Sequence, residues 1–148
     1  MKRLTLGALV LIAAMFIAAC GQTKDEVKDD RSAKTYQNID FKVKHVTTTK
    51  KGNEGKKDLV RIEMAIENND VAEVGVGGGD FKVKPNGDKE IEVAPGTANF
   101  GDMIKPGKIL TGKITYEIPA NTKSLQLLYQ PDGKKTELSW ELAVPKNK

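Results

Sequence analysis

The chain of 148 residues contains a single cysteine, Cys20, and a single histidine, His45. A disulfide needs two cysteines, and zinc sites built from cysteine and histidine need several such ligands, so both are excluded. His45 could act as a general base only if the fold brought a nucleophile and an orienting carboxylate to it. No motif points to such partners. We therefore expect a structural or surface role for His45 and assign no catalytic residue.

Cys20 lies at the end of an apolar segment near the N-terminus. Two basic residues precede the uncharged run 4–19, which is shorter than the ~20 residues that a membrane-spanning helix needs. A basic start, an apolar stretch and small residues at its end are typical of a secretory signal peptide. The sequence Ile17-Ala18-Ala19-Cys20 resembles the bacterial lipobox, which implies lipidation of the Cys20 thiol and cleavage after Ala19. We expect residues 1–19 to be a lipoprotein signal peptide, and Cys20 to anchor the mature chain in membrane lipid on the extracytoplasmic face of the cell membrane.

Two further patterns could bind ions or phosphates. Asp80 and Asp88 could bind a cation together with backbone carbonyls, although isolated acids beside glycine usually form turns. The glycine-rich stretch 75–79 has the composition of a phosphate loop, but a strand pattern follows it instead of a helix whose N-terminus could hold a phosphate. We therefore predict a domain that needs no metal and no cofactor.

The charge balance argues against a nucleic-acid partner. The chain has 24 basic and 20 acidic residues, and two of the basic ones lie in the predicted signal peptide, which leaves 22 − 20 = +2. Binding to phosphates needs a clustered basic face, and so small a surplus does not indicate one. The lysine pairs 50–51 and 56–57 flank a short polar loop that is expected to aid solubility. Near an anionic envelope this loop could contact lipid headgroups or teichoic acid.

Residues 21–38 show no apolar periodicity, and their four basic and four acidic side chains cancel. Such a segment has nothing with which to pack a core. Its acidic residues also lack the alternating ligands and the glycine of a calcium loop. We predict that residues 20–38 are the lipidated cysteine followed by a disordered, flexible tether.

From Ile39 onward, apolar and polar residues alternate with a period of two, which is typical of strands half buried in a sheet. The alternation is clearest over residues 60–66 and 110–118, where Thr115 is expected to face outward. It recurs over 39–43, 81–83, 100–104, 125–129 and 138–142, with Ile91 and Val93 returning from an Asn86-Gly87 turn. We expect His45 on the same side of its strand as Val43.

Seven or eight short strands, with turn signals every eight to twelve residues, predict an all-β fold. An immunoglobulin-like β-sandwich over residues 39–144 is the expected architecture, with a small barrel as the alternative and residues 145–148 as a C-terminal tail. Trp140 shares a face with Leu138 and Leu142, so we expect it between the two sheets.

The stretches 80–87 and 104–119, the second with its pattern Pro106-Gly107…Gly112…Pro119, resemble bacterial lipoproteins of domain-of-unknown-function family 4352. Residues 67–70 and 127–131 fit the same pattern, so the resemblance covers roughly residues 41–142. It implies a fold similar to that of a secreted mycobacterial immunoprotective antigen, an immunoglobulin-like sandwich. The family has no settled activity, so no functional residues carry over. The chain departs from the pattern at 77–79 and between residues 93 and 103.

These features predict a membrane-anchored extracytoplasmic lipoprotein that presents a binding or structural module to a protein or envelope-polymer partner. Two alternatives remain open. One is a chaperone or assembly factor that pairs an exposed strand edge with its clients, and an uncovered apolar edge would favour it. The other is a hydrolase or metal-dependent enzyme built around His45. A fold that brings no carboxylate within hydrogen-bond reach of His45, and that has no polar pocket, would favour the binding module.

Overall fold

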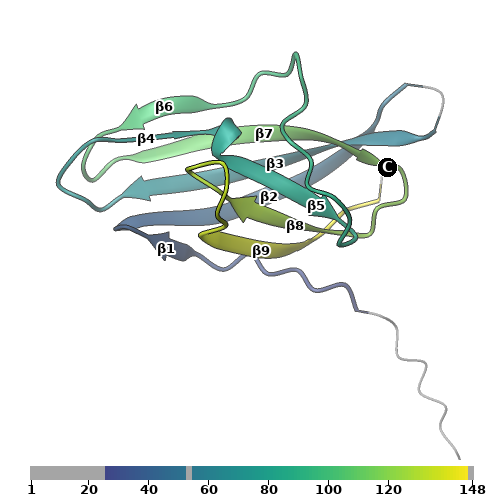
Figure 1. Cartoon of the computed structure of the whole chain (residues 1–148), viewed down its shortest axis with the longest axis horizontal. Helices are drawn as coiled ribbons and strands as arrows, with labels where there is room; N and C mark the ends of the chain where they lie inside the picture. The colour runs from purple at the N-terminus through teal and green to yellow at the C-terminus, as the bar shows by residue number, and fades with distance from the viewer. Residues whose placement is uncertain (1–25, 53–54, 147–148) are drawn as a thin grey trace, which may run out of the picture.

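The computed structural model describes residues 26–52 and 55–146, and this part of the chain forms two layers of antiparallel strands (Figure 1). The first sheet has the order β1-β2-β3-β7, and the second has the order β5-β8-β9. A ribbon of β4 and β6 lies beside β7. The bounds are β1 (Lys34–Tyr36), β2 (Ile39–Lys50), β3 (Lys57–Asn68), β4 (Val74–Gly77), the 3-10 turn η1 (Gly78–Asp80), β5 (Phe81–Pro85), β6 (Gly101–Ile104), β7 (Ile109–Pro119), β8 (Ser124–Tyr129) and β9 (Leu138–Ala143). The predicted all-β sandwich is confirmed. The predicted signal peptide and Cys20 lie outside the described residues.

The core lies between the two sheets and contains the apolar positions that the alternation indicates. In β3, every second residue from Val60 to Ile66 is fully buried, and Trp140 in β9 has no exposed surface. Aromatic rings join the layers. The Phe41 ring of β2, in the first sheet, lies 4.6 Å from the Tyr129 ring of β8 and 6.2 Å from the Phe81 ring of β5, both in the second sheet, measured between centroids. Ring packing across the sheets supplies cohesion that a disulfide supplies in other sandwiches.

A β-bulge in β2 changes which side chains face the core. The pairing of β2 with β3 shifts between Val43 and His45, so that Lys44 is the extra residue. Val46 is therefore buried, while His45 is exposed. The prediction that His45 shares the face of Val43 is wrong, because one inserted residue reverses the alternation beyond it.

The prediction of a disordered tether is wrong over the last part of residues 20–38. Residues Lys34–Tyr36 form β1 and pair with the start of β2. A two-residue turn joins the strands, and its residues Gln37 and Asn38 have positive φ angles of 49° and 60°. This is the backbone conformation that a tight hairpin turn requires. The folded domain therefore begins before Ile39.

Residues 29–33, which we call the N-terminal strap, lie along β9 (Figure 1). The Asp30 backbone N–H donates to the Glu141 carbonyl at 2.6 Å, and the Trp140 indole N–H donates to the Ser32 carbonyl at 3.0 Å. Hydrogen bonds from Ser32, and a Lys34 ammonium 3.1 Å away, hold the pKa of the Asp30 carboxyl well below its usual range. This contribution to strap attachment is present above the ordinary carboxyl pKa of about 4 and is lost as the pH falls through the lowered value.

Segment 94–100 covers the outer edge of β7. The Ala94 backbone N–H donates to the Thr115 carbonyl at 2.8 Å, and the Thr115 N–H donates to the Asn99 side-chain oxygen at 3.0 Å. Thr115 is consequently buried, with 4% of its surface exposed. The expectation that it faces outward is wrong, because a segment from elsewhere in the chain packs over it.

Candidate functional site

His45 meets no catalytic partner in the fold. Its side chain is exposed on β2, and it makes no hydrogen bond or ion pair with the other residues that the structure describes. The carboxylate opposite it, Glu63 on β3, pairs instead with the Lys113 ammonium at 3.6 Å. The orienting contact that a hydrolase would need at His45 is therefore not formed within 26–52 and 55–146.

Asp80 and Asp88 lie beyond opposite ends of β5 and do not share a site. A carboxylate oxygen of Asp80 accepts a hydrogen bond from the Gly77 N–H at 2.8 Å, which closes the turn η1. The Asp88 N–H donates to the Pro85 carbonyl at 2.8 Å, within the hairpin turn. Both acids thus form turns. No group of three His, Cys, Asp or Glu residues in the described part of the chain could hold a metal ion.

Backbone contacts cover the outer edges of three strands. The strap covers β9, segment 94–100 covers β7, and Ile91 exchanges backbone hydrogen bonds with Val83 of β5 at 2.7 and 3.0 Å. The strand expected at Ile91 and Val93 is reduced to this single bridge. A client strand that paired at these edges would have to displace the bonds at Val83 of β5, Thr115 of β7 and Glu141 of β9.

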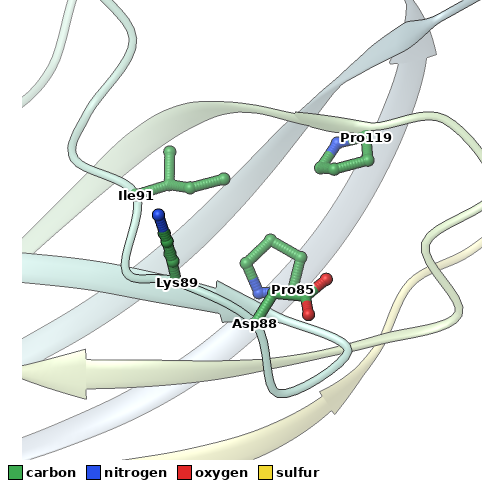
Figure 2. Close-up of a pocket in the computed structure, with 5 residues that line it drawn as sticks. All are labelled: Pro85, Asp88, Lys89, Ile91 and Pro119. Carbon is green, nitrogen blue, oxygen red and sulfur yellow. The ribbon is translucent and has the colours of Figure 1, made fainter.

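Two hollows lie at the end of the sandwich where β2 turns into β3, which we call the basic end. The first hollow has a volume of about 530 Å³. Figure 2 shows Pro85, Ile91 and Pro119 around it, with Asp88 and Lys89 on the adjoining hairpin loop. Its one acid and one base are chain neighbours, so this hollow has no convergent set of polar groups. It offers mainly apolar contact.

The second hollow is a groove of about 790 Å³ into which four separate segments converge. Apolar side chains from the N-terminal and C-terminal segments contribute to its lining, and lysines from three of the segments stand at it. The groove is lined by Val27, Lys50, Gly55, Asp58, Ala120, Asn121, Thr122, Lys123, Ala143, Val144, Pro145 and Lys146. An apolar lining with lysines beside it suits a ligand that carries both apolar and anionic groups.

Positive charge gathers around this groove. Among the described residues of the basic end, exposed lysines outnumber acids eight to five; the lysines are Lys28, Lys50, Lys51, Lys56, Lys57, Lys89, Lys123 and Lys146, and the acids are Glu26, Asp29, Asp58, Asp88 and Glu117. Lys51 and Lys57 both pair with the Glu117 carboxylate, the latter at 2.6 Å, and they hold its pKa below the usual value. Two cations thus share one anion, which leaves a positive excess.

The buried side chain of Asn68 organises the opposite end of the sandwich. Asn68 has no exposed surface, and its amide group donates to the carbonyls of Ala72 and Ile104, each at 2.7 Å. Its side-chain oxygen accepts a hydrogen bond from the Asp70 N–H at 2.8 Å. These bonds tie the β3–β4 loop to β6. Asparagine followed by Asn69 and Asp70 is typical of a turn, and only the fold shows that the Asn68 amide is buried and fully hydrogen-bonded.

Large apolar side chains are exposed around Asn68. Val71 is 92% exposed, Ile109 is 61% exposed and Met103 is 56% exposed, and no other large hydrophobic residue in the described chain is classed as exposed. They lie in the β3–β4 loop, at the start of β7 and on β6, far from the β2–β3 hairpin in Figure 1. We call this the apolar end. The sequence pattern did not single out these three residues, because each belongs to a different segment.

The fold and its two contrasting ends can be compared with known proteins. The family model described as "Domain of unknown function (DUF4352)" matches residues 26–137. The chain belongs to the DUF4352 family. The resemblance inferred from the residues is thus confirmed, and the DUF4352 match includes the strap that the sequence pattern had placed in the tether. A comparison with curated protein sequences finds no significant match.

Three solved structures share the fold of this DUF4352 chain. The candidate lipoprotein ycdA from Bacillus subtilis has a TM-score of 0.60 and 15% identity, over 78% of this chain and 39% of that one. The yjhA protein from Bacillus subtilis has a TM-score of 0.54 and 17% identity, over 77% and 96%. MPT63, a secreted protein from Mycobacterium tuberculosis, has a TM-score of 0.56 and 16% identity, over 70% and 82%. At these identities the likeness shows the fold alone. The chain spans less than half the length of ycdA.

No helix in the described part of the DUF4352 chain is both long and apolar enough to span a membrane.

Proposed function

We propose that this DUF4352 chain is a lipoprotein, anchored through Cys20 on the extracytoplasmic face of the cell membrane, whose sandwich serves as a binding module for a protein partner. The lipobox pattern at residues 17–20 supports the anchor. The fold shared with a candidate lipoprotein and with a secreted protein is consistent with that location. The binding role rests on one observation, the exposed apolar end.

The apolar end has the character of a protein contact surface. Val71, Met103 and Ile109 expose large apolar side chains around a loop that Asn68 holds rigid. Charged residues lie beside them in sequence: Asp70, Glu73, Asp102, Lys105 and Lys108. Grouped apolar residues with a polar rim mark interaction sites on soluble domains. This end also lies away from the side where the N-terminal segment leaves the fold, so an anchored domain would present it to partners.

Replacing Cys20 with serine should abolish the anchor, because the serine hydroxyl cannot form the thioether to the lipid. We expect mass spectrometry of the wild-type mature protein to find a lipid-modified Cys20 at its N-terminus, and the protein to fractionate with membranes. The Cys20→Ser chain should lack both the lipid and the cleavage after Ala19. A matched Gln22→Ser change should leave both intact. Normal processing and membrane retention of Cys20→Ser would contradict the proposal.

A photo-crosslinking residue at Val71 should give a defined product in intact cells, because this side chain stands at the proposed contact surface. The same residue at Thr47, which is exposed on β2, should not give this product. Introducing Met103→Asp and Ile109→Asp should remove the product by placing charge in the contact. Identical products from both positions, or a product that survives these changes, would argue against binding at the apolar end.

A further inference from the structure

The position of Val27 shows where the N-terminal segment leaves the sandwich. The strap runs along β9 toward the basic end, where a carboxylate oxygen of Asp29 accepts a hydrogen bond from the Ala143 N–H at 3.2 Å. Val27 then lines the groove itself. Seven residue steps separate Cys20 from Val27, and fully extended they span at most roughly 25 Å. A lipid on Cys20 therefore holds the basic end, and not the apolar end, close to the membrane.

The two ends of the sandwich also differ in charge, and the end held close to the membrane is the more positive one. At the basic end the described lysines outnumber the acids eight to five, whereas the apolar end mixes Asp70, Glu73 and Asp102 with Lys105 and Lys108. Salt screens charges beyond about 8 Å at physiological ionic strength. Electrostatic attraction to an anionic lipid surface therefore acts only on the end that a short tether keeps near the bilayer. In this chain that end is the one with the positive excess.

We propose that the basic end docks onto anionic phospholipid headgroups of the membrane that holds Cys20, with Lys50, Lys123 and Lys146 contacting the headgroup phosphates. The inference rests on the proposed anchor for its orientation. All three lysines are exposed and stand at the groove, with Val27, Val144 and Pro145 among the apolar lining. Basic residues close to an anionic leaflet are attracted to it. Docking places the basic end against the membrane, so that the apolar end at the other end of the sandwich points away from it.

Vesicle binding tests the docking without the anchor. The mature chain from residue 20 with Cys20→Ser contains every residue that the structure describes, and it carries no lipid. We expect it to sediment with equimolar phosphatidylcholine and phosphatidylglycerol vesicles, to stay free of pure phosphatidylcholine vesicles, and to be released by added salt. Changing Lys50, Lys123 and Lys146 to glutamine should weaken binding by about a hundredfold, at about fivefold per lysine.

A second triple variant provides the matched control. Changing Lys42, Lys105 and Lys108 to glutamine removes the same charge from exposed positions away from the basic end, so binding should fall by less than about threefold. Equal losses in the two triple variants would overturn the proposal, as would equal binding to both kinds of vesicle. Lysine-dependent binding to soluble inorganic polyphosphate but not to vesicles would also overturn it, in favour of an envelope polymer. If Cys20 proved unlipidated in cells, the anchor would fail while this vesicle result would stand.

Discussion

Replacing Trp140 with alanine should lower the free energy of unfolding by about 3–5 kcal/mol, as measured by denaturant melts. The Trp140 side chain has no exposed surface and pairs across the second sheet with Leu127, which is also fully buried. Its removal leaves a large cavity that neighbouring strands can fill only in part. The change also deletes the donor to the Ser32 carbonyl, so the N-terminal strap should loosen. Trypsin should then cleave at Arg31 faster than in the wild-type chain.

A Trp140→Phe variant separates these two effects. Phenylalanine keeps much of the buried ring but has no N–H to donate, so the hydrogen-bond part of the loss should be only about 1 kcal/mol. Strap cleavage should nevertheless accelerate, because the bond to Ser32 is lost in both variants. A loss below about 1 kcal/mol for Trp140→Ala would contradict the burial of this residue. Unchanged cleavage at Arg31 in both variants would contradict the strap contact.

Replacing Gly112 with valine should destabilise the fold by about 3 kcal/mol, the upper end of the usual cost of overpacking. A Cβ atom at Gly112 would lie 2.3 Å from Cγ of Phe100, far closer than two carbon atoms can approach. The Phe100 ring would have to leave its place, and it would lose its contact with the Phe81 ring, whose centroid is 6.2 Å away. Thermal and denaturant melts of the purified variant measure the effect.

The coupling between Gly112 and Phe100 provides the control. In a background that already carries Phe100→Ala, the Gly112→Val change should cost less than in the wild-type chain, because the clashing ring is absent. A valine at the neighbouring exposed position, Thr111, should change stability by no more than about 0.5 kcal/mol. If the two effects were strictly additive, contact with Phe100 would not be what requires glycine at position 112.

The most specific part of the family pattern therefore has a structural explanation. Gly107 has a φ of 73°, a left-handed turn conformation that favours glycine after Pro106. Gly112 gives the Phe100 ring room to lie against β7. The pattern Pro106-Gly107…Gly112 thus encodes a turn and a close approach of two segments, and it points to no ligand.

Local alternation was sufficient to predict the larger part of the core. Residues 60–66 repeat apolar side chains at every second position, and residues 110–118 do so except at Gly112. A sheet with one buried face requires this period, so β3 and β7 could be identified with their core faces. Trp140 was predicted in the core for the same reason, and the structure confirms it. The Asn86-Gly87 turn was also predictable, since both residues have positive φ.

Features that depend on contacts between distant segments were not predictable. The strap attaches through a Trp140–Ser32 bond that spans 108 residues of sequence. Strand β1 follows from a turn whose first residue, Gln37, is not a type that signals positive φ. The bulge at Lys44 places His45 on the opposite face of β2 from the one expected. The alternation of apolar and polar residues does not show where a strand contains an extra, unpaired residue.

The residues of the basic end and the apolar end also fall into two groups: those that a local sequence pattern identified and those that only the fold brought together. By itself, the sequence determined the lysine pairs at 50–51 and 56–57 as a basic loop and Cys20 as the predicted anchor, because each is a local pattern. Only the tertiary structure brought Lys123, Lys146 and Val27 to that loop, and only it placed Val71, Met103 and Ile109 together at the other end. The physical reason is that antiparallel pairing in a sandwich carries alternate loops to opposite ends. Residues tens of positions apart then meet wherever strand register puts them.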